Sequence, residues 1–113
     1  MIVCVPVDDV GAVDPRWGRA SQVALATVED GAITDWQEIA VGWDSLHDAG
    51  SEAAHHARVA RFLRERHVEV VVAHHMGGGM SRMLETMHVT VYLGASGDAR
   101  LAVQSAGASP LPR

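Results

Sequence analysis

Residues 68–73, VEVVVA, form a continuous apolar run between two amphipathic stretches, and this run decides the fold. An uninterrupted run of this kind is typical of a central parallel strand that is covered on both faces. The preceding stretch, 51–66, begins with a capping serine, Ser51, and has apolar residues at helical spacing. The following stretch has the i, i+3, i+4, i+7 spacing of a short helix, at Met80, Met83, Leu84 and Met87. The centre of the chain therefore predicts helix, strand, helix.

Outside this centre the chain alternates apolar segments with turn residues. Strands are expected at residues 1–7, 22–28, 33–41, 68–73 and 89–93. Helices are expected at 51–66, 80–87 and 98–106. Loops are expected at 8–19, 42–50, 77–79 and 94–97, and Glu29-Asp30-Gly31 predicts a hairpin turn. Two β-α-β crossovers then make three strands parallel, so we expect an α/β fold: a mixed five-stranded sheet with an antiparallel hairpin edge and helices on its faces.

Length and composition restrict the class of protein. The chain has 113 residues, which predicts a single domain over 1–107 and a disordered tail over 108–113. The net charge is −5 and all nine basic residues are arginine, so a nonspecific nucleic-acid binder is not expected. The single cysteine, Cys4, excludes a disulfide framework and a four-cysteine iron–sulfur site within one chain. The chain has no apolar stretch of membrane-spanning length and no secretion signal, so we expect a cytoplasmic protein without membrane contact.

The predicted topology brings four segments to the edge of the sheet at the carboxyl ends of the parallel strands. In open α/β sheets this is the edge where ligands bind. The segments are 8–19, the start of the 51–66 helix with the loop before it, 74–79 and 94–97. Five of the seven histidines lie in this set: His47, His55, His56, His74 and His75. Because imidazole is the commonest metal ligand among side chains, this clustering predicts a metal or metallocluster site.

The same edge has features that favour an anion. Arg16 and Arg19 lie in the first of these loops and suit a carboxylate or a phosphate. Backbone amides are expected to contribute at helix N-termini and at the tight turn made by Gly94, Ala95, Ser96 and Gly97. The glycine run 77–79 is similar to a phosphate-cradling loop, but no lysine follows it, which excludes a Walker A motif.

Several of these residues also have a structural interpretation. His56 lies on the predicted core face of the 51–66 helix, where a hydrogen-bonded core histidine is the commoner outcome, and His55 is displaced from that face towards solvent. The methionines of the 80–87 helix are soft thioether donors, but their spacing favours the core. Cys4 is expected in the core of the first strand. The serines lack a nucleophile motif and the later strands lack converging carboxylates, so we expect a protein that is not an enzyme.

The chain resembles the dinitrogenase iron–molybdenum cofactor biosynthesis family, the NifX/NafY-like domain. The resemblance rests on VPVDD, WGRA, EDG, HDAGSEAAHHARVARFL, VVVAHHMGGGM and VYLGASGDAR, in this order along the chain. It implies a ribonuclease H-like fold and binding of iron–sulfur–molybdenum cofactor precursors by the loops at the sheet edge. The family commonly has His-Phe-Gly-Arg-Ala, with the histidine as a proposed cluster ligand. Here Arg16 holds that histidine's position, and an arginine does not ligate metal.

The leading hypothesis is a carrier of a metal ion or of an iron–sulfur or iron–molybdenum-type cluster, which exchanges it with a donor or acceptor protein. Its expected ligands are His56, His74 and His75, assisted by His47 or His55. Its expected anion-binding groups are Arg16, Arg19 and the amides of residues 94–97. One alternative is a regulatory or binding module for a small anionic ligand without metal. Another is a ribonuclease H-like hydrolase that needs Mg²⁺ or Mn²⁺.

Overall fold

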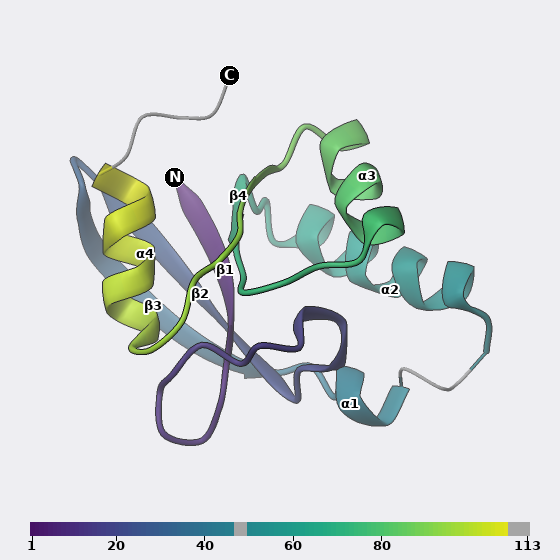
Figure 1. The fold of residues 1–113 in the computed structure, drawn as a ribbon. Coiled ribbons are helices and arrows are strands. Elements are labelled where there is room, and N and C mark those ends of the chain that lie inside the picture. The colour runs from purple at the N-terminus through teal and green to yellow at the C-terminus, as the bar shows by residue number, and fades with distance from the viewer. Residues whose placement is uncertain (47–49, 109–113) are drawn as a thin grey trace.

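The chain forms a five-stranded mixed sheet with helices on both faces, in a computed structural model that describes residues 1–46 and 50–108 (Figure 1). The strands are β1 (Ile2–Val7), β2 (Gln22–Glu29), β3 (Ala32–Ala40), β4 (Val70–Val72) and β5 (Thr90–Tyr92). Their order across the sheet is β3-β2-β1-β4-β5. β4 is parallel to β1 and β5, whereas β2 is antiparallel to both of its neighbours. The predicted mixed sheet with a hairpin at one edge is therefore confirmed.

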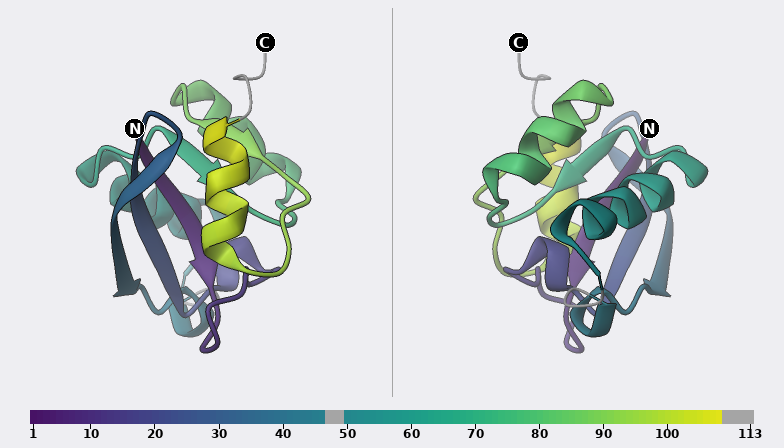
Figure 2. Two further views of the ribbon diagram at one scale, coloured as in Figure 1. Left: turned by 90° about the vertical axis from the view of Figure 1, so that its left-hand side faces the viewer. Right: turned by 90° about the vertical axis from the view of Figure 1, so that its right-hand side faces the viewer.

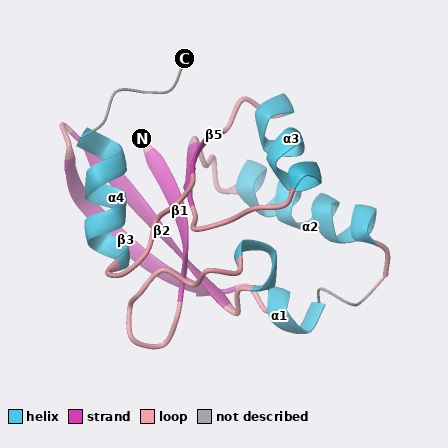
Figure 3. Cartoon of the chain, viewed as in Figure 1, coloured by secondary structure: helices cyan, strands magenta, loops and turns pink. Residues whose placement is uncertain are grey.

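The described part of the chain also contains four α-helices and one 3-10 turn, and the last helix follows β5 (Figure 3). They are η1 (Trp17–Arg19), α1 (Trp43–Leu46), α2 (Glu52–Glu65), α3 (Gly78–Thr86) and α4 (Ala99–Ala108). Two loop predictions are corrected, because α1 lies within 42–50 and α3 begins inside the glycine run. α4 extends to Ala108, where the tail was expected to begin, and the rest of the predicted tail, 109–113, lies outside the described residues.

The β2–β3 hairpin turns where the sequence predicts it. Asp30 and Gly31 have φ angles of 52° and 78°, so both central residues of the turn are left-handed. This is the pattern of a type I′ turn, whose twist matches that of the flanking strands and which favours an Asp-Gly pair. The hairpin fixes β3 as one edge of the sheet.

Both faces of the sheet are buried at its central strands, as the apolar run at the centre of the sequence predicts. Successive residues of a strand point to opposite faces. Val3, Val5 and Val7 of β1 accordingly pack in the core beneath α4, whereas Cys4 packs in the core beneath α2 and α3. Figure 2 shows α4 on one side of the sheet and the α2–α3 pair on the other. No helix in the described ranges has the length and apolar character needed to span a membrane.

The loop after β1 separates the carboxyl ends of β1 and β4. The two strands pair only at Val3 and Cys4, and beyond this point the Asp14 amide donates to the Pro6 carbonyl over 3.0 Å. Further along the loop, Arg16 forms a parallel β-bridge with His75, which lies beyond the end of β4. The predicted meeting of residues 8–19 with residues 74–79 at this edge is confirmed.

Candidate functional site

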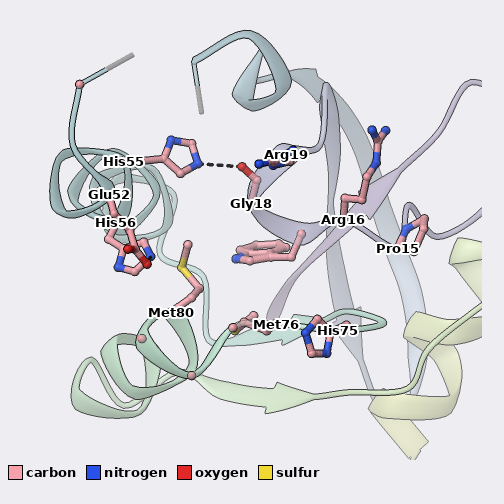
Figure 4. A pocket seen from close by; sticks show the side chains of 15 residues that line it. Pro15, Arg16, Gly18, Arg19, Glu52, His55, His56, His75, Met76 and Met80 are labelled. Atoms are coloured by element: carbon pink, nitrogen blue, oxygen red, sulfur yellow. Dashed lines mark hydrogen bonds and ion pairs between the residues drawn. The ribbon is translucent and has the colours of Figure 1, made fainter. Parts of the chain in front are cut away.

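A pocket of about 670 Å³ lies at the carboxyl end of the sheet, between the first loop, α2 and α3 (Figure 4). We refer to it as the central pocket, and it is lined by residues 15–19, Gly50, Glu52, His55, His56 and residues 75–80. Three of the four segments predicted to converge thus form its walls: the η1 loop, the first turns of α2, and the segment from His75 into α3. The α2 wall begins at a capped helix N-terminus, where the Ser51 hydroxyl accepts from the Ala54 amide at 3.0 Å.

His55 is the buried histidine of α2, which corrects the predicted helix face. It is 3% exposed, and its Nε2 lies 2.7 Å from the carbonyl oxygen of Gly18. Because a carbonyl only accepts, Nε2 donates, and the Nδ1 atom accepts from Arg58 Nη1 at 2.7 Å. Both ring nitrogens are therefore occupied within the protein, and His55 holds η1 against α2 instead of presenting a nitrogen to the pocket.

His56 is half-buried beside the start of α3. Its Nε2 lies 3.7 Å from a carboxylate oxygen of Glu52, one turn earlier on α2. A Cβ atom built on Gly79 would lie 3.2 Å from His56 Cε1, so the His56 ring packs against the α3 backbone where residue 79 has no side chain. His56 is the α2 imidazole that can ligate a guest in the central pocket.

Arg16, Arg19 and His75 are exposed residues of the pocket wall. The Arg16 side chain is held by Asp14, with Nε 3.3 Å from one carboxylate oxygen and Nη2 3.4 Å from the other. Asp14 is 4% exposed and also accepts from the Arg16 amide at 3.0 Å, so it is committed to this loop and does not form a site with the histidines. The bridge between Arg16 and His75 places a guanidinium and an imidazole on neighbouring backbone positions.

Other predicted site residues lie away from the pocket lining. His74 is exposed, and its Nδ1 donates to the carbonyl of Ala95 over 3.2 Å. In the turn that follows β5, the Gly94 amide donates to His74 and the Ala95 amide to Ala73, which leaves these two amides committed to backbone carbonyls. Ser96 and Gly97 continue this turn, and the Gly97 carbonyl accepts from the Val13 amide. His47 lies outside the described residues.

The N-terminus of α3 lies inside the glycine run, two residues earlier than the sequence predicts for this helix. Gly77 caps the helix without a side-chain hydrogen bond, and the first turn is made by Gly78, Gly79 and Met80. Amides in the first turn of a helix have no acceptor within that helix, and the helix dipole adds partial positive charge there. The pocket therefore has a wall of backbone donors, which is the kind of surface that suits an anion.

Trp17, Met76 and Met80 complete the lining and were not predicted as site residues. All three are largely buried, with exposed fractions of 2%, 7% and 5%. The WGRA motif and the two methionines flanking the glycine run were the available signals in the sequence. Cys4 makes no contribution, because it is fully buried in β1 and burial raises the pKa of its thiol. Among the described residues, no group of three or more His, Cys, Asp or Glu side chains is arranged to hold a metal ion.

Comparison with solved structures identifies chains of the same fold. PH0822 superposes with a TM-score of 0.77 at 16% identity, over 99% of this chain and 95% of that chain. The apo orange protein from Desulfovibrio gigas gives 0.75 at 20% identity, over 98% and 92%. A Thermotoga protein provisionally described as a NifB protein gives 0.67 at 21% identity, over 92% and 84%. At these identities the similarity shows the fold alone.

A search among curated proteins finds no match. A scan against protein families, in contrast, matches residues 1–109 to the family described as "Dinitrogenase iron-molybdenum cofactor". The match includes every wall of the central pocket, from the η1 loop through α2 to the start of α3. The chain belongs to the dinitrogenase iron–molybdenum cofactor family.

Proposed function

We propose that this protein carries an anionic metallocluster, of iron–sulfur or iron–sulfur–molybdenum type, in the central pocket and does not catalyse a reaction on it. The observation that carries this proposal is the convergence on one cavity of a helix N-terminus without a side-chain cap, two arginines and two accessible imidazoles. Membership in a family named for an iron–molybdenum cofactor supports a cluster as the anion. A protein that gives up or takes over the cluster is the expected partner.

The cluster would be held by charge and hydrogen bonds, with His56 and His75 as direct ligands. Arg19 would neutralise its negative charge from the η1 side, and Arg16 would do so by exchanging its contacts with Asp14 for the cluster. The first-turn amides of α3 would act from the opposite side. The thioether of Met80 is a further soft donor at the wall. A single transition-metal ion bound by the same imidazoles is the simplest variant of this cargo.

The test is metal analysis and absorption spectroscopy of protein purified without oxygen. Stoichiometric iron or molybdenum with charge-transfer bands is the expected result, and a colourless protein that refuses added cluster would overturn the proposal. The His75→Ala variant should lose affinity, whereas His74→Ala, at the neighbouring exposed position outside the pocket lining, should not. Equal losses in both variants would show that the effect comes from the loop and not from ligation.

A small anionic ligand without metal is the second candidate. It is favoured because the described residues contain no preformed group of three or more metal-ligating side chains, while the helix N-terminus and arginines need no metal to bind an anion. Titration of metal-free protein with phosphate and sulfate tests it. Binding of either anion with the same dependence on Arg19 and the α3 wall would favour this candidate over the carrier.

We further assign the sheet to the ribonuclease H-like class, on its order with β2 as the one reversed strand among the five. A hydrolase of that class would need carboxylates that converge on catalytic metal ions. The absence of nucleic-acid cleavage with both Mg²⁺ and Mn²⁺ is therefore the expected result. A cytoplasmic location remains a prediction from the sequence.

A further inference from the structure

The indole N–H of Trp17 is a buried donor without an acceptor. Trp17 is 2% exposed, and its Nε1 is the one buried side-chain polar atom among the described residues that has no hydrogen-bond partner. The indole N–H only donates, so it needs a hydrogen-bond acceptor as its partner. An unpaired buried donor destabilises the folded state, and the great majority of such groups in folded proteins are paired.

The ring that carries this donor is held in place by other aromatic side chains. Trp17 packs edge-on against Trp43 of α1, with ring centroids 5.3 Å apart and an interplanar angle of 69°. Trp43 in turn packs edge-on against Phe62 of α2 at 5.7 Å and 88°. Such geometries are favourable for aromatic pairs, and together they link η1, α1 and α2. The indole is therefore fixed before any ligand binds.

The fixed indole lies at the same cavity as the amide wall of α3. Trp17 lines the central pocket together with the first turn of α3. A Cβ atom on the neighbouring Gly18 would lie 3.8 Å from Met80 Cε, so η1 and the start of α3 approach to van der Waals distance. Trp17, which carries the unpaired donor, and the first turn of α3 thus line one cavity from two separate elements.

We propose that the Trp17 N–H is a recognition donor of the central pocket, which selects anions that present oxo or sulfido atoms as hydrogen-bond acceptors. This inference rests on the proposed anionic cargo and specifies its chemistry. A bare cation gains nothing from an indole N–H, because the group has no lone pair to offer and directs its positive end at the guest. The pocket should therefore discriminate between an oxo- or sulfidometalate and the corresponding free metal ion.

The experiment uses molybdate, tetrathiomolybdate and Zn²⁺ as probes for uniformly ¹⁵N-labelled protein. The three tryptophans give three indole resonances, which single Trp→Phe variants assign. Saturation with a bound anion should shift the Trp17 resonance downfield, as a new hydrogen bond requires, and Zn²⁺ should leave it in place. The Trp36 resonance is the internal reference, because its Nε1 already donates to Glu38 at 3.0 Å outside the pocket.

Affinities of variants give a second, independent readout. Trp17→Phe keeps an aromatic ring but removes the donor, and we expect a loss of about tenfold or more in anion affinity with no change for Zn²⁺. Trp36→Phe is the matched control and should bind as the wild type does. Replacement of Trp17 by benzothienylalanine, which exchanges the N–H for sulfur in a ring of similar shape, separates loss of the donor from loss of packing.

The outcomes distinguish this inference from the proposed function beneath it. If the wild type binds an anion but its Trp17 resonance does not move and both Trp17 replacements retain full affinity, the recognition role is wrong and the anionic cargo stands. If the wild type binds neither anion, both proposals are overturned. A response to molybdate alone or to tetrathiomolybdate alone assigns oxo or sulfido atoms as the acceptors that Trp17 recognises.

Discussion

Replacement of Gly77 by aspartate should stabilise the protein and weaken anion binding at the same time. Gly77 caps α3 with φ −65° and ψ 155°, the extended conformation typical of an N-cap residue. A Cβ atom there would meet nothing within 4 Å, so a larger side chain fits without rearrangement. The carboxylate of Gly77→Asp would accept from the Gly79 or Met80 amide, which are the donors assigned to the ligand.

The gain in stability follows from capping and from charge. Exchange of glycine for aspartate at an N-cap gains a few tenths of a kcal/mol, and a negative charge at this end of the helix dipole adds about 0.3–1 kcal/mol. A total of about 1 kcal/mol is expected. With an unfolding entropy of about 2.1 cal/mol/K per residue over 113 residues, this raises Tm by roughly 4 °C.

The loss in affinity follows from competition and repulsion. A unit charge about 5 Å from one charge of the guest costs about 3 kcal/mol at an effective dielectric of 20, which is roughly two orders of magnitude in Kd. Because the mouth of the pocket is exposed to solvent, we expect a smaller effect, of at least about tenfold. Gly77→Asn is the matched control, because it caps the helix equally well without the charge.

Thermal unfolding followed by circular dichroism and calorimetric titration with tetrathiomolybdate measure the two effects. A Gly77→Asp variant that is more stable and binds as tightly as the wild type would refute the assignment of the α3 wall to the ligand. A less stable variant would instead contradict the description of residue 77 as an open N-cap. Equal weakening by Asp and Asn would show that occupied amides matter and charge does not.

Three further predictions concern the start of α3, the contacts of His55 and the buried thiol of β1. Gly78→Ala should raise stability by about 0.5–1 kcal/mol through helix propensity, whereas Gly79→Ala should gain less, because its Cβ would lie 3.2 Å from His56 Cε1; comparison of their Tm values checks this. Arg58→Ala should cost about 1 kcal/mol in urea unfolding, since it removes hydrogen bonds to the buried imidazole and to a backbone carbonyl, and unchanged imidazole ¹⁵N shifts would contradict this. Burial raises the pKa of the Cys4 thiol, so above pH 9 the unfolded state loses this proton before the folded state does. From pH 9 to 10.5 the wild type should therefore lose stability faster than Cys4→Ala, by up to about 1.4 kcal/mol per pH unit, and parallel curves would refute the burial.

Local patterns determined most of the architecture. The apolar run 68–73, the Asp-Gly turn and the capping serine of α2 each predict an element that the structure contains. The start of α3 was missed, because three successive glycines have a poor intrinsic helix propensity. The helix begins there all the same, since burial of Met80 and Leu84 against the sheet outweighs the local preference.

The phase of α2 shows why the site was harder to predict than the fold. Val59 and Leu63 are buried under either phase, so the apolar pattern alone does not distinguish His55 from His56 as the third buried position. The choice is made by Gly18, which is distant in sequence and brings its carbonyl to 2.7 Å from the His55 ring. The turn 94–97 lies outside the pocket lining for a similar reason. It lies at the expected end of the sheet, but its backbone amides and carbonyls form hydrogen bonds with residues that the topology alone does not identify.

The net charge of −5 is compatible with an anionic cargo. The repulsion by the whole chain and the attraction by the pocket donors act over different distances. Repulsion by the whole chain is screened beyond about 8 Å at physiological ionic strength, whereas amide and indole donors act at contact. A negative surface therefore reduces nonspecific binding of anions and leaves the pocket effective.

The weak ligand set of the proposed site suits transfer of the cargo between proteins. Cargo held by hydrogen bonds and one or two imidazoles, with no thiolate available in the pocket, can leave without the rupture of several strong metal–ligand bonds. Storage would require the opposite arrangement, a closed set of strong ligands.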